Sequence, residues 1–188
     1  MNLPECDNAI QEALTRERPK KLVHLINRFL QKNAKAKQSL DFVCLMCQEE
    51  GPEGKARAFF SAPPPTIVFC ANRLHSAREV EETMMHELIH AYDFVVRTMD
   101  ITNPSILACS EIRAARESEC YQKAFALQKL LPESKLLKTM SEWKNKRCVR
   151  RHAIRSTQSM FPDEAVDDVD KMLEMCYSDQ APFDKSDP

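Results

Sequence analysis

Apolar residues recur at helical spacing over most of the chain, and this pattern predicts a mostly helical protein. The expected helices cover residues 8–31 with a break near Pro19, 76–98, 103–119 or on to 131, 134–146, and 162–176. Ser76 and Glu79 form a capping-box pattern at the start of the second stretch. A polar connector with several lysines follows the first helical stretch, and an irregular tail is expected from Asp179 onward.

A small sheet is expected between the first two helical stretches. Residues 66–70 (TIVFC) are β-branched and aromatic and are bounded by breakers, so they form the best strand candidate. The preceding stretch, residues 48–65, holds both glycines and a run of three prolines, which is typical of a loop. A short strand over residues 56–60 is predicted inside it.

Composition supports a helical globular protein and excludes several other classes. The chain has 188 residues and two glycines, where average usage gives about 13, so it has few flexible turns for hairpins. With 43% hydrophobic and 29% charged residues, wholesale disorder is excluded. A formal net charge of -1 argues against a strongly basic nucleic-acid module, and we expect no nucleic-acid partner.

The chain lacks the sequence features of a membrane span or a conventional targeting segment. No stretch approaches the run of about 20 apolar residues that a membrane-spanning helix needs. The N-terminal residues contain no apolar core typical of a secretory signal, and their acidic residues argue against a mitochondrial matrix presequence. We therefore expect a soluble or peripheral protein.

Eight cysteines are dispersed along the chain. An even number of dispersed cysteines is consistent with a disulfide framework in an oxidising compartment, and buried thiols in a cytosolic core are an equally open alternative. The pair Cys44 and Cys47 could be half of a zinc site, but no second half follows at zinc-finger spacing. If disulfides form, these two should pair with distant cysteines, because a ring closed over two intervening residues is strained.

The strongest chemical signal is an H-E-x-x-H motif inside the predicted helix over residues 76–98. His86 and His90 are four residues apart, so they lie about 40° apart on one helix face and can bind one metal ion. Glu87 lies on the adjacent face, where it can reach a water molecule beside that ion. Random order would give this motif about once in 100 chains of this composition. The arrangement indicates one Zn²⁺ ion and peptide hydrolysis, with Glu87 as the general base.

The third metal ligand has two candidates. Asp93 lies on the same helix as the histidines, one turn beyond His90. Glu111 lies on the next predicted helix, from which a carboxylate can approach the ion from another direction. Glu111 is thus the predicted ligand, and Asp93 is predicted to orient a histidine ring. The alternative for Glu111 is a surface carboxylate paired with a nearby arginine. The strand at residues 66–70 is expected to be the sheet edge with which an extended substrate pairs.

Several short motifs resemble the family of mitochondrial inner membrane metalloproteases that process and assemble ATP synthase, also known as the Ku70-binding protein family. The matching stretches are residues 67–72, 86–93 and 107–115, Cys120, residues 148–150 and 176–179, and Phe42, Cys44, Cys47, Pro182 and Phe183. The resemblance covers about residues 40–185. A glycine-rich stretch of the family is replaced here by residues 58–63. The disulfide candidates within the matching region are Cys44, Cys47, Cys70, Cys109, Cys120, Cys148 and Cys176.

The resemblance implies a location and a substrate. It implies a peripheral enzyme on the intermembrane-space side of the mitochondrial inner membrane, in a compartment entered by oxidative folding. It implies cleavage of the N-terminal extension of an ATP synthase membrane-sector subunit, and a role in ATP synthase assembly that does not require proteolysis.

The basic stretch over residues 144–155 is open to two interpretations. It can be a solvated helix face, or it can contact anionic lipid of the inner membrane, where each basic residue adds about 1 kcal/mol.

Together these observations predict a mostly α, zincin-like metallopeptidase with a minimal sheet. Residues 1–39 are expected to form an N-terminal helical segment, and residues 40–185 the peptidase domain. The alternative function is a non-catalytic assembly factor or interaction scaffold with a retained zinc site. The intact motif favours the enzyme, because a scaffold has no physical need for Glu87.

Overall fold

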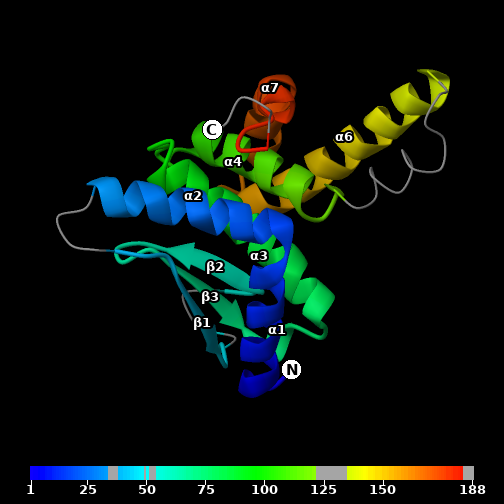
Figure 1. The fold of residues 1–188 in the computed structure, drawn as a ribbon. Coiled ribbons are helices and arrows are strands. Elements are labelled where there is room, and N and C mark those ends of the chain that lie inside the picture. Colours follow the sequence, from blue (N-terminus) through cyan, green and yellow to red (C-terminus); the bar gives the residue numbers. More distant parts are fainter. Residues whose placement is uncertain (34–37, 49, 51–53, 122–134, 184–188) are drawn as a thin grey trace. The chain divides into compact units, whose positions relative to one another are not determined.

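The computed structural model describes residues 1–33, 38–48, 50, 54–121 and 135–183. The chain forms two compact units, Met1–Thr98 and Met99–Pro188. The first unit combines helices with a three-stranded sheet, and the described part of the second unit is helical (Figure 1). The mostly helical character with a small sheet agrees with the prediction from the sequence.

The first unit begins with two consecutive helices, α1 (Leu3–Thr15) and α2 (Glu17–Asn33). Asn2 caps α1: its side-chain oxygen accepts from the Glu5 amide at 2.9 Å, and the Glu5 carboxylate accepts from the Asn2 amide at 2.9 Å. The sequence predicted a break near Pro19, but the break between the two helices falls at Arg16. Pro19 lies in the first turn of α2, where a backbone N–H has no partner within the helix, so its missing donor costs little.

Three strands form one sheet in the order β1-β3-β2. They are β1 (Asp41–Leu45), β2 (Ala58–Ser61) and β3 (Thr66–Cys70), and β3 pairs in parallel with β1 and antiparallel with β2. The bounds of β3 are those predicted, and β2 begins two residues later than predicted, whereas β1 was not predicted. The expectation that β3 is the sheet edge is wrong: it is the central strand, and β1 and β2 are the edges.

The long helix α3 (Ala77–Val95) covers the sheet and packs on both N-terminal helices (Figure 1). It contacts β2, β3, α1 and α2. Its buried apolar side chains join those of the other elements to form the core of this unit. The largest fully buried members are Leu22, Ile26, Ile67, Phe69, Leu74, Met84, Leu88 and Ile89.

The second unit is built from α4 (Pro104–Glu117), α6 (Lys135–Thr157) and α7 (Ala165–Ser178), which pack on one another. Helix α4 ends two residues before the predicted end, and its suggested continuation falls mostly on residues outside those described. Helix α6 reaches Thr157, so the predicted end at residue 146 is wrong. The core of this unit contains Ile112, Ala115, Val149, Ala153 and Val169.

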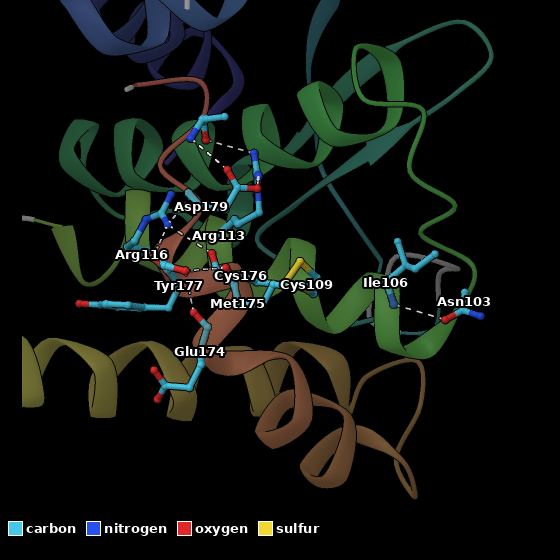
Figure 2. The surroundings of a disulfide bond; sticks show 12 residues. Asn103, Ile106, Cys109, Arg113, Arg116, Glu174, Met175, Cys176, Tyr177 and Asp179 are labelled. Carbon is cyan, nitrogen blue, oxygen red and sulfur yellow. Dashed lines mark hydrogen bonds and ion pairs between the residues drawn. A yellow bond between two sulfur atoms is a disulfide. The ribbon is translucent and has the colours of Figure 1, made fainter. Parts of the chain in front are cut away.

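The segment after α7 is irregular, as predicted, but it is bound to α4. The fully buried Arg113 side chain forms an ion pair with Asp179 and donates to the Ala181 carbonyl at 3.1 Å. Arg116 donates to the carbonyls of Tyr177 and Asp179, at 2.7 and 2.6 Å. Figure 2 shows these interactions beside the disulfide that joins α4 to α7. Two arginines of α4 thus hold residues 177–181 through polar contacts, which the hydrophobic pattern of the sequence does not predict.

All eight cysteines form disulfides, and none is free. The pairs are Cys6–Cys44, Cys47–Cys70, Cys109–Cys176 and Cys120–Cys148. Each bond lies within one unit. As expected, Cys44 and Cys47 pair with distant partners, so they do not form half of a zinc site. Cys6 was not among the candidates, but it pairs with Cys44, because the capped helix α1 packs against β1.

No helix in the described part of the chain is long and apolar enough to cross a membrane.

Candidate metal centre

Helix α3 starts at a defined point directly after the sheet. Ser76 caps it by accepting from the Glu79 amide at 3.2 Å. The Glu79 carboxylate accepts from the His75 amide at 2.9 Å rather than from the amide of the cap residue Ser76. Only one half of the predicted capping box is therefore formed. The cap fixes where the helix begins and therefore which of its residues face the core.

His86 and His90 lie on consecutive turns of α3 and are both buried, with 8% and 7% of their surface exposed. Their ring centroids are 4.8 Å apart with the planes at 73°, so the two imidazoles lie side by side on one face, as the spacing predicted. Two neutral imidazoles at this separation can hold one metal ion between them.

Glu87 and Asp93 are buried carboxylic acids on the same helix. Glu87 is 7% exposed and Asp93 is fully buried. Buried carboxylates are uncommon unless they are paired or coordinate a metal, because removing the charge from water is costly. Slightly more than two turns of one helix thus concentrate two imidazoles and two carboxylates among buried apolar side chains, which include Met84, Leu88 and Ile89.

Glu111 belongs to the second unit, where it lies in the middle of α4. Its side chain is 6% exposed, and its neighbours Ser110 and Ile112 are fully buried. The alternative of a surface carboxylate therefore does not hold. The nearby arginines, Arg113 and Arg116, have their guanidinium groups on Asp179, Glu117 and backbone carbonyls.

Asn103 caps the N-terminus of α4, and its side-chain oxygen accepts from the amides of Ser105 and Ile106 at 3.1 and 3.3 Å. Further along the helix, the Cys109–Cys176 disulfide joins α4 to α7, and the two buried arginines tie α4 to the segment after α7 (Figure 2). The sequence predicted disulfides for the cysteines, whereas it offered the two arginines only as partners of a surface Glu111. Helix α4 also contains Glu111 and Glu117, so no local pattern in the sequence marks the contacts of these two arginines.

The donor types suit a metal ion. His86, His90 and Glu111 offer two imidazole nitrogens and a carboxylate oxygen, all from buried residues that could bind a metal. Catalytic zinc in proteins takes three ligands of these types and leaves a fourth position for water. Glu87, which follows His86 in sequence, is a further buried carboxylate on α3.

A second group of metal-binding residue types lies in the second unit, where the sulfurs of Cys120 and Cys148 are close to His152. These two cysteines are joined in a disulfide. A cysteine binds a metal ion as a thiolate, so two disulfide-bonded cysteines do not supply ligands in the oxidised protein.

Comparison with known proteins identifies a peptidase family. The Peptidase M76 family matches residues 4–184 of the chain. No solved structure matches.

Curated relatives carry a consistent name. The chain is 33% identical to the mitochondrial inner membrane protease ATP23 homolog of Danio rerio, over 71% of this chain and 52% of that protein. It is 32% identical to mitochondrial inner membrane protease atp23 of Sclerotinia sclerotiorum, over 84% and 66%. It is 31% identical to mitochondrial inner membrane protease ATP23 of Meyerozyma guilliermondii, over 98% and 73%. The chain thus spans between half and two-thirds of the first two relatives.

Proposed function

The chain belongs to the Peptidase M76 family, and on this basis we propose that it is a zinc-dependent endopeptidase. One observation carries the proposal: His86 and His90 lie side by side on α3, with the buried Glu87 between them in sequence. A scaffold gains nothing from burying this carboxylate, since an unused buried carboxylate only lowers stability.

We propose distinct roles for the residues of the site. His86, His90 and Glu111 hold the zinc ion, and Asp93 orients one of the histidine rings through its carboxylate. When bound, zinc lowers the pKa of a water molecule and polarises the scissile carbonyl. Glu87 accepts the proton of the attacking water and then donates it to the leaving amine. Burial of Glu87 keeps bulk water from competing for that proton.

We further propose that the enzyme works on the intermembrane-space side of the mitochondrial inner membrane, as a peripheral protein. The relatives are named mitochondrial inner membrane proteases. Four disulfides and no free cysteine are consistent with an oxidising compartment.

The proposed substrate is the N-terminal extension of an ATP synthase membrane-sector subunit, and a separate role in ATP synthase assembly is proposed with it. The resemblance found in the sequence supports both. Cleavage of the precursor of that subunit by purified protein tests the substrate. An unrelated mitochondrial precursor serves as the control, and equal cleavage of both would contradict the substrate assignment.

The experiment that tests the enzyme itself combines metal analysis with peptide cleavage. Purified protein should contain one zinc ion per chain and cleave peptides, and chelation followed by zinc addition should abolish and restore cleavage. Protein that binds zinc but never cleaves would instead favour the non-catalytic assembly factor.

A further inference from the structure

A stripe of exposed side chains runs along α6, in the second unit. We call it the outer α6 stripe, and it consists of Met140, Trp143, Lys144, Arg147, Arg151 and Arg155. Trp143 is 60% exposed and Met140 is 45% exposed, which is unusual for such large apolar side chains. The peptidase chemistry proposed above makes no use of these residues.

Helical geometry places the six residues together. At about 100° per residue they fall in a sector about 120° wide. Val149 and Ala153 lie on the opposite side of α6 and are fully buried in the core of this unit. The six residues of the outer α6 stripe are exposed, so they are not needed for the packing of α6 in this unit.

The charges of α6 are divided between its sides. Lys146 and Arg150 flank the buried side and form ion pairs with Glu174 and Asp170 of α7, at 2.7 and 2.5 Å. Two acidic residues of α7 therefore compensate these two cations. Glu142, the one acidic residue within α6, falls outside the sector of the outer α6 stripe by the same helical geometry. The outer α6 stripe holds four basic side chains and no acidic one.

An aromatic residue lies among these cations. The guanidinium of Arg147 lies 5.6 Å from the centroid of the Trp143 ring, which is within cation–π range. An exposed indole beside arginines and lysines is the combination that peripheral proteins use at a bilayer surface. The ring enters the headgroup region while the cations contact lipid phosphates.

We propose that the outer α6 stripe binds the surface of an anionic phospholipid bilayer. Trp143 and Met140 supply the apolar contact, and Lys144, Arg147, Arg151 and Arg155 supply the charge complementarity. The exposed apolar pair favours lipid over nucleic acid, because phosphate contacts alone would not require it. The inference deepens the proposed peripheral location by naming its surface, and it does not depend on the peptidase chemistry.

The chain contains its own probe, because Trp143 is its only tryptophan. Adding phosphatidylcholine vesicles that contain phosphatidylglycerol should shift Trp143 emission to the blue, and lipids with a quencher near the headgroup should quench it. Pure phosphatidylcholine vesicles should produce neither effect. High salt should reverse the binding, because exposed charges are screened.

Two triple variants with the same net charge separate the stripe from overall charge. The stripe variant carries Arg147→Gln, Arg151→Gln and Arg155→Gln. The control carries Lys20→Gln, Arg28→Gln and Lys32→Gln on α2, all at exposed positions. Each basic residue contributes about fivefold, so the stripe variant should bind anionic vesicles on the order of 100-fold more weakly than the native chain. The control should bind nearly as the native chain does.

Several results would overturn the proposal. One is that Trp143 emission of the native chain does not shift on anionic vesicles. Another is that both triple variants lose the same vesicle affinity, and a third is that duplex DNA shifts the emission but vesicles do not.

If the triple stripe variant does not fold, as judged by circular dichroism, the single changes at Arg147 and Arg151 give the same comparison at about fivefold each. Peptide cleavage in solution, measured on the same samples, should be unchanged in the stripe variant. Failure of the lipid proposal is thereby distinguished from failure of the peptidase proposal.

Discussion

The Arg113 side chain of α4 is fully buried and forms an ion pair with Asp179, whose side chain is 28% exposed. Arg113 is two residues from Glu111 on the same helix. The pair therefore fixes the C-terminal segment against the helix that carries the proposed third ligand (Figure 2).

We predict that Asp179→Ala destabilises the protein more than an ordinary surface substitution does. The change removes a carboxylate partner of a buried guanidinium, which costs about 3 kcal/mol in the free energy of unfolding. Asp163→Ala, at an exposed position outside the helices, is the matched control and should change stability by less than about 0.5 kcal/mol. Urea unfolding measures the free energy of unfolding of both variants. Equal losses of stability in the two would show that the ion pair contributes nothing.

The disulfide between α4 and α7 should stabilise the second unit substantially. Cys109 and Cys176 are 67 residues apart in sequence, so opening this bond releases a long loop in the unfolded chain. Replacing both by serine should lower the free energy of unfolding by about 4 kcal/mol.

Thiol labelling of native protein without reductant should find no free thiol. Eight free thiols in protein isolated from mitochondria would contradict the oxidised state.

Tyr177 should ionise above the usual range for tyrosine. Burial raises the pKa of its phenol, and the charge of Glu142 adds to this effect; the hydroxyl also donates to Asn145 at 2.8 Å. Because the folded-state pKa lies above the unfolded-state value near 10, this contribution to stability is complete below about pH 10 and is lost as pH rises through the folded-state pKa.

Ultraviolet titration of the folded protein checks this directly. A tyrosine titration step should occur above the usual range, and Tyr177→Phe should remove that step. A late step that persists in the variant would assign it to another tyrosine.

The two candidate carboxylates for zinc should behave differently. Glu111→Ala removes a proposed ligand, whereas Asp93→Asn alters a group that orients one. The second change should weaken zinc binding by about 10- to 100-fold, and the first by more than that. Metal titration of folded protein compares them, and a larger loss in Asp93→Asn would reverse the two roles.

The sequence predicts those parts of the fold that depend on local patterns. Strand β3 and helix α3 could be located because β-branched runs and capping residues act over a few positions. The place of β3 in the middle of the sheet could not, because β1 was not recognised as a strand and pairing depends on tertiary contacts. The pairing of Cys6 with Cys44 and the binding of residues 179–181 by Arg113 are long-range contacts with no local signal.

For the site, the four-residue spacing of the histidines was sufficient to predict that both rings lie on one face of a helix, and their 4.8 Å centroid separation agrees. Burial of Glu87 and Glu111 could not be read from the sequence, because both positions are polar within helices of mixed composition.

The central claim is that Glu87 is the catalytic base of a zinc peptidase, and one variant tests it most directly. Glu87→Gln keeps the size of the side chain and removes the proton acceptor. We predict that it binds one zinc ion per chain, as the native protein does, and cleaves peptide at least about 100-fold more slowly. A zinc-loaded Glu87→Gln protein that cleaves at the native rate would contradict the account.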